Sequence, residues 1–166
     1  MAPASLKITT CLWFDGQAEE AANFYTSIFP NSKITAIKRY LEAGREIHGR
    51  EPGSVMVVEF DLDGHHFVGL NGGPQFKFNE AVSFQIDCAD QDEVDYYWSK
   101  LGEGGDPAKQ ECGWIADKFG VSWQVVPKVL KEMISSEDKA AAERATMAMM
   151  KMNKMNIAEL EAAFKG

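Results

Sequence analysis

The fold is decided by Glu20-Ala21-Ala22-Asn23-Phe24-Tyr25-Thr26-Ser27-Ile28, because its pattern returns later in the chain as Val94-Asp95-Tyr96-Tyr97-Trp98-Ser99-Lys100-Leu101. In both stretches apolar side chains stand at i, i+3, i+4 and i+7, and two large rings occupy the adjacent central positions. This spacing predicts the same amphipathic helix twice. Each copy follows an apolar segment and precedes β-rich sequence, which indicates an internal duplication.

The segments around the first helix predict a βαβββ module. Asp63-Gly64 is typical of a two-residue hairpin turn between the last two strands. The polar, glycine-containing stretch 42–53 predicts a loop. The expected strand, helix and three further strands cover residues 8–14, 18–29, 33–40, 55–62 and 66–70.

The second helix predicts a similar module with one strand shortened. Asp90 or Asp92 is placed to cap this helix, which ends near Gly102. One strand is expected before it and two after it, over residues 81–88, 111–117 and 121–126. After Pro127 the pattern changes to helices, expected over residues 129–134, from 136 or 137 to about 152, and 156–164.

These patterns predict an α+β fold made of tandem βαβββ modules and a C-terminal helical tail. The chain has 166 residues, enough to bury one full core. We expect the modules, residues 6–74 and 79–127, to form one domain over residues 1–130. Residues 131–166 are the helical extension.

The composition argues against several partners. The net charge of -8 disfavours a general nucleic-acid surface and contact with an anionic membrane. No apolar run approaches the roughly 20 residues that span a bilayer, and no signal peptide is evident, so the expected location is the cytoplasm. Cys11, Cys88 and Cys112 lack metal-type spacing and predict reduced core thiols, with a catalytic or bridged cysteine as the alternative.

The tail is rich in methionine. Its five methionines are too dense for one narrow helical face, and methionine packs adaptably against varied surfaces. The tail is therefore expected either to fold onto its own domain or to form a dimer contact. The residues are Met147, Met149, Met150, Met152 and Met155.

Four groups of motifs establish a family resemblance. They are Leu12-Trp13-Phe14-Asp15-Gly16 with Glu20-Ala21-Ala22-Asn23-Phe24-Tyr25, Gly69-Leu70-Asn71-Gly72-Gly73-Pro74, Phe76-Lys77-Phe78-Asn79-Glu80, and Gly113-Trp114 with Asp117-Lys118-Phe119-Gly120-Val121-Ser122-Trp123-Gln124. With the tandem modules, they resemble the PhnB-like family, often labelled 3-demethylubiquinone-9 3-methyltransferase, of the glyoxalase, bleomycin-resistance and dioxygenase (vicinal oxygen chelate) superfamily. The resemblance covers residues 6–127 and implies a curved, partly open mixed sheet with the site on its concave face.

The resemblance also implies where a metal would bind. Metal-dependent members place His or Glu ligands on the first and last strands of each module. Divalent metals prefer carboxylate or imidazole ligands, whereas the set here offers at best one amide and a hydroxyl. We therefore expect no divalent metal and no other cofactor. The corresponding positions are Thr9 or Thr10, Val68 or Gly69, Ala81 or Val82, and Gln124.

The histidines do not replace the missing ligands. His65 and His66 are adjacent, so a strand turns them to opposite faces, and His48 falls in the polar loop. His66 is closer to the body of its strand and is the candidate for a lone general base.

Eight residues are candidates for ligand binding. Aromatic rings on a concave sheet offer area to a planar or acyl ligand, and polar side chains at the rim anchor it. Gln124 falls where the superfamily places a metal-binding carboxylate; a position on the opposite face, or a bond to a neighbouring strand, is its alternative. Each ring alone is also compatible with the core, and the asparagines with turn chemistry. The candidates are Trp13, Asn71, Phe76, Phe78, Asn79, Trp114, Trp123 and Gln124, with Glu80 beside them.

The sequence thus predicts a homodimer that binds a small organic molecule without the usual divalent metal, its reaction unassigned. The alternative is an enzyme of the PhnB-like branch, either the labelled methyltransferase or a metal-dependent isomerase, lyase or dioxygenase. Common S-adenosylmethionine enzymes need a Gly-rich turn between a strand and a helix. Here no helical pattern follows the glycines between Gly64 and Gly73, so the residues give methyl transfer no support.

Overall fold

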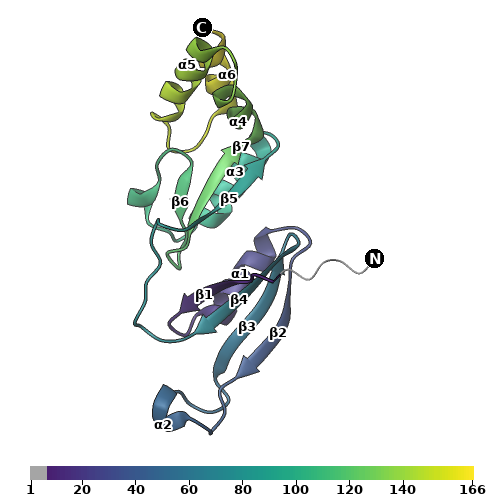
Figure 1. The fold of residues 1–166 in the computed structure, drawn as a ribbon, viewed down its shortest axis with the longest axis vertical. Helices are drawn as coiled ribbons and strands as arrows, with labels where there is room; N and C mark the ends of the chain where they lie inside the picture. The colour runs from purple at the N-terminus through teal and green to yellow at the C-terminus, as the bar shows by residue number, and fades with distance from the viewer. Residues whose placement is uncertain (1–6) are drawn as a thin grey trace. The chain divides into compact units, whose positions relative to one another are not determined.

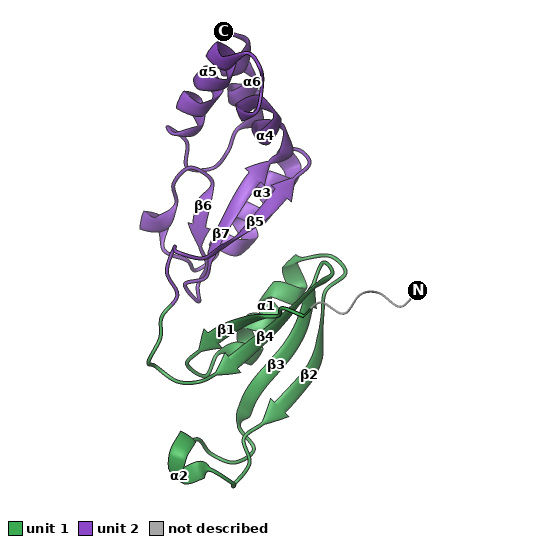
Figure 2. Cartoon of the chain, in the orientation of Figure 1, with its two compact units in different colours: residues 1–77 green, residues 78–166 purple. Residues whose placement is uncertain are grey.

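A computed structural model describes residues 7–166 of the chain and divides the chain into two compact units between Lys77 and Phe78 (Figure 2). Each unit has its own mixed sheet with a helix packed on one face (Figure 1). The α+β class predicted from the sequence is confirmed. Within residues 7–166, no helix has the length and apolarity needed to cross a membrane.

The first unit has the predicted βαβββ order. The sheet order is β1-β4-β3-β2, with β1 parallel to β4 and the other pairs antiparallel. Asp63 and Gly64 form the expected hairpin turn, with φ angles of 43° and 85°. A short helix, α2, interrupts the predicted loop. The elements are β1 (Thr10–Phe14), α1 (Ala18–Ile28), β2 (Lys33–Arg39), α2 (Arg45–His48), β3 (Val55–Leu62) and β4 (His65–Asn71).

Helix α1 packs on one face of the first sheet. Its buried residues Ala21, Tyr25 and Ile28 are three of the four predicted stripe positions, whereas the fourth, Phe24, is half-buried. Gly69 lets the start of α1 lie close to β4, because a Cβ on Gly69 would be only 3.2 Å from the Cβ of Ala18. The opposite face, called the open face of the first unit, is only partly covered. Alternation along the strands places on it Cys11, Trp13, Val57, Glu59, Asp61, His66, Val68 and Leu70.

The second unit departs from the predicted repeat. Its sheet has the order β5-β7-β6, with β5 parallel and β6 antiparallel to β7, so three strands are seen in this part of the described chain. The expected strand over 111–117 begins only at Trp114, and no strand in the described part of this unit corresponds to β2. The elements are β5 (Ser83–Cys88), α3 (Gln91–Gly102), the 3-10 helix η1 (Pro107–Lys109), β6 (Trp114–Ala116) and β7 (Ser122–Pro127).

The missing strand has a local cause. The segment between α3 and β6 is short and contains Gly104 and Gly105, and Asp106 caps η1 by accepting a hydrogen bond from the Ala108 N–H. Pro107 has no N–H to give to a strand ladder. Cys112 has φ 50° in a turn, so the expectation that it lies in a strand is wrong.

The helical tail is part of the second unit. Leu160 and Met155 are fully buried, so the tail supplies core residues. Two backbone hydrogen bonds fasten it beside β6: Cys112 donates to Met152 (2.8 Å) and Gly113 to Asn153 (2.7 Å). The tail helices are α4 (Lys128–Ile134), α5 (Lys139–Met149) and α6 (Ile157–Lys165).

The cysteines are free, as predicted, but only one is a core thiol. Cys88 is buried, and burial raises the pKa of its thiol to about 12. Cys11 is exposed because it projects from β1 on the open face, so its assignment to the core is wrong.

Candidate functional site

Trp13 and Phe76 form an aromatic pair beside the open face of the first unit. Their ring centroids are 4.8 Å apart, and the planes meet at 78° in an edge-on contact. The indole N–H of Trp13 donates to the carbonyl of Gly73 (2.8 Å), which fixes the ring, while Phe76 stays 63% exposed. Gly72 is required here, because a Cβ would lie 2.2 Å from the indole. The structure thus brings together two of the predicted ligand-binding residues.

Asn71 is buried rather than placed at a rim. Its Oδ1 accepts a hydrogen bond from the N–H of Ala18 (2.9 Å), and its Nδ2 donates to the carbonyl of Val55 (3.1 Å). The hydroxyl of Tyr40 donates to the backbone carbonyl of Asn71 (2.7 Å). Gln17, the residue before α1, makes no side-chain cap. Asn71, at the end of β4, caps this helix instead.

His66 lies on the open face within a row of charged side chains. Its Nδ1 is 2.7 Å from Oδ1 of Asp61, and its Nε2 is 4.0 Å from Oε2 of Glu59. Lys38 hydrogen-bonds to Glu59 and thereby lowers the pKa of that carboxyl. This arrangement orients the imidazole, and its use as a general base remains a prediction. Among residues 7–166, no group of three or more His, Cys, Asp or Glu side chains is placed to hold a metal ion.

Gln124 lies on the face of the second sheet opposite the buried side chains of Trp123 and Val125. Its Nε2 donates to the hydroxyl of Ser83 on β5 (2.8 Å), so it is also bonded to a neighbouring strand. Trp114 is its register partner on β6 and shares its face. Ser83 was missed by sequence reasoning, although its alternation with Phe84 in β5 is the signal for this face.

Trp123 belongs to the core. It is buried, its indole N–H donates to Oδ2 of Asp117 (2.8 Å), and its ring lies 5.3 Å from that of Phe84. Asp117 also accepts hydrogen bonds from the backbone N–H groups of Phe119 and Val121, which shapes the turn before β7. The structure therefore separates Trp123 from Gln124, its neighbour in the sequence.

The remaining candidates begin the second unit. Phe78 is half-buried, whereas Asn79 is exposed and accepts a hydrogen bond from the N–H of Ala81 (3.0 Å). Glu80 pairs with Lys109 at 2.6 Å, and this hydrogen bond lowers the pKa of Glu80 and raises that of Lys109. Glu80 and Lys109 line a cavity of about 400 Å³ together with Trp114, another of the predicted ligand-binding residues. Its lining is Glu80, Ala108, Lys109, Glu111, Cys112 and Trp114.

A family model and two solved structures with TM-scores above 0.5 agree with this architecture. The family model described as 3-demethylubiquinone-9 3-methyltransferase matches residues 6–126. A solved structure from Bacillus cereus, called a PhnB protein and provisionally a 3-demethylubiquinone-9 3-methyltransferase, is 38% identical, with a TM-score of 0.62 over 74% of this chain and 99% of that chain. A protein from Pseudomonas aeruginosa, 20% identical, gives a TM-score of 0.56 over 74% and 98%, respectively, and shows the fold alone. A lactoylglutathione lyase from Agrobacterium tumefaciens is 20% identical, with a TM-score of 0.38 over 77% and 97%. No curated protein gives a significant match.

Proposed function

Because the chain belongs to the 3-demethylubiquinone-9 3-methyltransferase family, as its PhnB-like motifs indicated, we propose that it binds a small organic molecule with a planar apolar part. The observation that supports this most directly is the aromatic pair. Phe76 is 63% exposed and stands edge-on to a fixed Trp13. A ring with a fixed partner offers contact area at little entropic cost.

The open face extends this aromatic surface. Val57, Val68 and Leu70 lie on it and are only half-buried, so the rings adjoin further apolar area. An isolated exposed ring needs no explanation, whereas a contiguous apolar patch marks a binding surface. The second unit offers its own surface, where Trp114 adjoins a cavity and Gln124 supplies a polar anchor.

We propose binding without a divalent metal. Val68 has no ligand atom, and Gln124 offers only an amide that already bonds to Ser83. Elemental analysis of protein purified without chelator tests this point. A stoichiometric amount of Ni, Zn, Fe or Mn would contradict it.

Methyl transfer is the alternative that the family description suggests. Both parallel strand pairs are separated in the chain by more than a single helix, and the turn between β1 and α1 contains one glycine, Gly16. Neither feature supports an S-adenosylmethionine site of the Rossmann type. Calorimetric titration with S-adenosylmethionine discriminates, since micromolar binding would favour the enzyme.

We also propose that the chain forms a homodimer through its tail. Met147 and Met150 are 56% and 60% exposed, although both are large apolar side chains. A hollow of about 830 Å³ between α5 and α6 is lined by alanines and by side chains of both charge signs, including Arg144 and Glu159. A two-fold interface brings the same patch of both subunits together, and a patch that carries both charge signs and apolar area can pair with its own copy.

The indole N–H signals in a ¹H–¹⁵N correlation spectrum test ligand binding. We expect the neutral probe 2-naphthamide to shift the signal of Trp13, and Trp114 reports in parallel on the second unit. Phe76→Ser should weaken the effect at Trp13 by about three- to tenfold, the value of one aromatic pair. Ile47→Ser is the matched control, because Ile47 is an exposed apolar residue of the same unit. Unchanged binding in Phe76→Ser would refute the site.

A further inference from the structure

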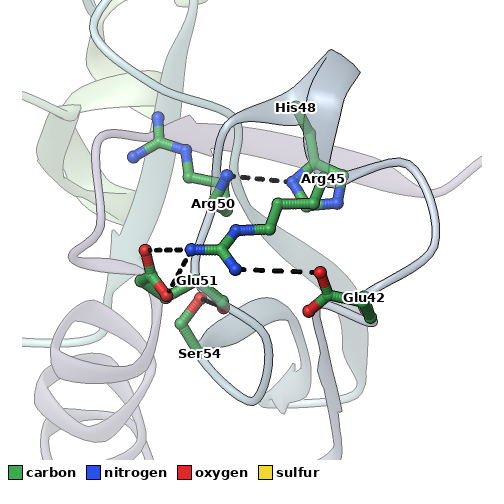
Figure 3. Close-up of polar contacts among 6 residues, drawn as sticks. All are labelled: Glu42, Arg45, His48, Arg50, Glu51 and Ser54. Atoms are coloured by element: carbon green, nitrogen blue, oxygen red, sulfur yellow. Dashed lines mark hydrogen bonds and ion pairs between the residues drawn. The ribbon is translucent and has the colours of Figure 1, made fainter.

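Two arginines of one loop have different surroundings (Figure 3). The loop lies between β2 and β3 and contains α2. Arg45 is hydrogen-bonded to a carboxylate: its Nη2 lies 2.9 and 3.1 Å from the two carboxylate oxygens of Glu51, and its Nη1 lies 3.7 Å from Glu42. Figure 3 shows the guanidinium of Arg50 pointing away from this cluster.

The backbone of Arg50 is held in place. Its N–H donates to Nδ1 of His48 (3.0 Å), and the His48 ring lies 4.6 Å from the ring of Tyr40. Tyr40 in turn donates its hydroxyl to the carbonyl of Asn71, at the end of β4. These contacts anchor the loop to the end of the strand from which the Gly72-Gly73 turn departs.

The side chain of Arg50 reaches Gly73, in the turn that holds Trp13. A Cβ on Gly73 would lie 2.5 Å from its Nη2, and Gly73 is the residue whose carbonyl holds the Trp13 indole. The carboxamide of Gln75 approaches the same point of Gly73. The cation therefore lies next to Gly73, the residue whose carbonyl accepts the hydrogen bond of the Trp13 indole.

The guanidinium of Arg50 makes few contacts with the described part of the protein. Its side chain is 30% exposed, and its charged contact within residues 7–166 is Asp15, at 3.8 Å. None of its five donors makes a hydrogen bond to a described residue. A guanidinium forms its strongest bonds as a planar fork on a carboxylate or phosphate, and a 3.8 Å contact leaves that fork open.

We infer that Arg50 recognises the anionic group of the ligand, and that the ligand is a planar organic acid whose apolar body lies against Trp13 and Phe76. This inference rests on the proposed function, whose substrate class it names. Arg50 supplies a local positive charge in a chain whose net charge of -8 does not itself attract an anion.

The test compares two probes of the same shape, 2-naphthoate and neutral 2-naphthamide, by titration of the Trp13 indole signal. Naphthoate should bind at least about fivefold more tightly, because a charge-assisted hydrogen bond exceeds a neutral one. Arg50→Gln should abolish this preference, and Arg50→Lys should retain part of it. Arg45→Gln is the matched control from the same loop and should keep the preference.

The outcomes are distinguishable. Equal binding of both probes, with no effect of Arg50→Gln, overturns the inference and leaves the proposed function standing. Equal loss of both probes in Arg50→Gln, with an altered spectrum of the loop, assigns Arg50 a purely structural role and also overturns the inference. If neither probe shifts Trp13, the inference and the proposed function fail together.

Discussion

At the scale of single residues, Gly72 leaves room for the Trp13 ring of the aromatic pair because it has no side chain. The indole of Trp13 occupies the space that a Cβ on Gly72 would fill, at 2.2 Å. Gly72→Ala must therefore displace the ring and its hydrogen bond to Gly73. We expect a loss of about 1–3 kcal/mol in the free energy of unfolding, the usual cost of overpacking. Urea unfolding measures this loss.

A double-variant cycle checks the cause of that loss. In a Trp13→Ala background, Gly72→Ala no longer clashes with an indole. The loss in free energy of unfolding that it causes should therefore fall to a small fraction of the loss in the parent protein. An equal cost in both backgrounds would show that the backbone of Gly72, and not the ring, requires glycine.

The cysteines should differ in reactivity according to burial. Burial raises the pKa of Cys88 to about 12, so at pH 8 its thiolate fraction is on the order of 1 in 10,000. Partial burial also raises the pKa of Cys11, but this thiol is exposed. Iodoacetamide should therefore label Cys11 before Cys88, faster as the pH rises, and Cys88 only after unfolding. Peptide mass spectrometry follows both sites, and early labelling of Cys88 would contradict its burial.

At the scale of elements, Asn71 joins the end of β4 to the start of α1. Asn71→Ala leaves the N–H of Ala18 and the carbonyl of Val55 without their partner, each in or near the core. An unsatisfied buried group costs about 1–3 kcal/mol, so we expect a total loss of about 2–4 kcal/mol in unfolding free energy. Chemical denaturation measures it. Asn79→Ala, which removes one exposed local hydrogen bond, is the control and should change stability by less than about 1 kcal/mol.

Local patterns predicted the elements well, and pairings distant in sequence explain the misses. The stripe of Ala21, Tyr25 and Ile28 is a property of one helix, so its spacing is readable in the sequence. The role of Asn71 depends on the parallel pairing of β1 with β4, which no local spacing shows. Alternation indicated that Trp123 and Gln124 face opposite ways, but which of them lies under α3 depends on packing.

Arg50 shows the same limit within the site. It falls in a polar loop with no periodicity, and no motif distinguishes it from Arg45. Its position beside Gly73 follows from the anchoring of the loop on Tyr40 and from the turn after β4. A site built from loop ends is accessible only after the fold is known.

At the scale of the whole molecule, the tail completes the second unit. Ending the chain after Ser136 removes Met155 and Leu160, both fully buried, and the hydrogen bonds that Gln91 makes to Met155 and Ile157. We expect the second unit, which holds three of the four tryptophans, to lose cooperative unfolding, as followed by tryptophan fluorescence. Gln91→Ala is the milder control and should lower stability without abolishing the transition. An unchanged unfolding midpoint in the truncated chain would show that the tail is dispensable.

The exposed methionines of the helical tail are the predicted dimer contact. Met155 is buried in the core, whereas Met147 and Met150 are exposed, and Met147 lines the hollow between α5 and α6. Met147→Glu places a charge on this surface without touching the core, so we expect it to convert a dimer to a monomer in sedimentation equilibrium. Ile47→Glu, an equally drastic change at an exposed residue of the first unit, should remain dimeric. A monomeric parent protein, or a dimer in Met147→Glu of unchanged affinity, would exclude the tail as the interface.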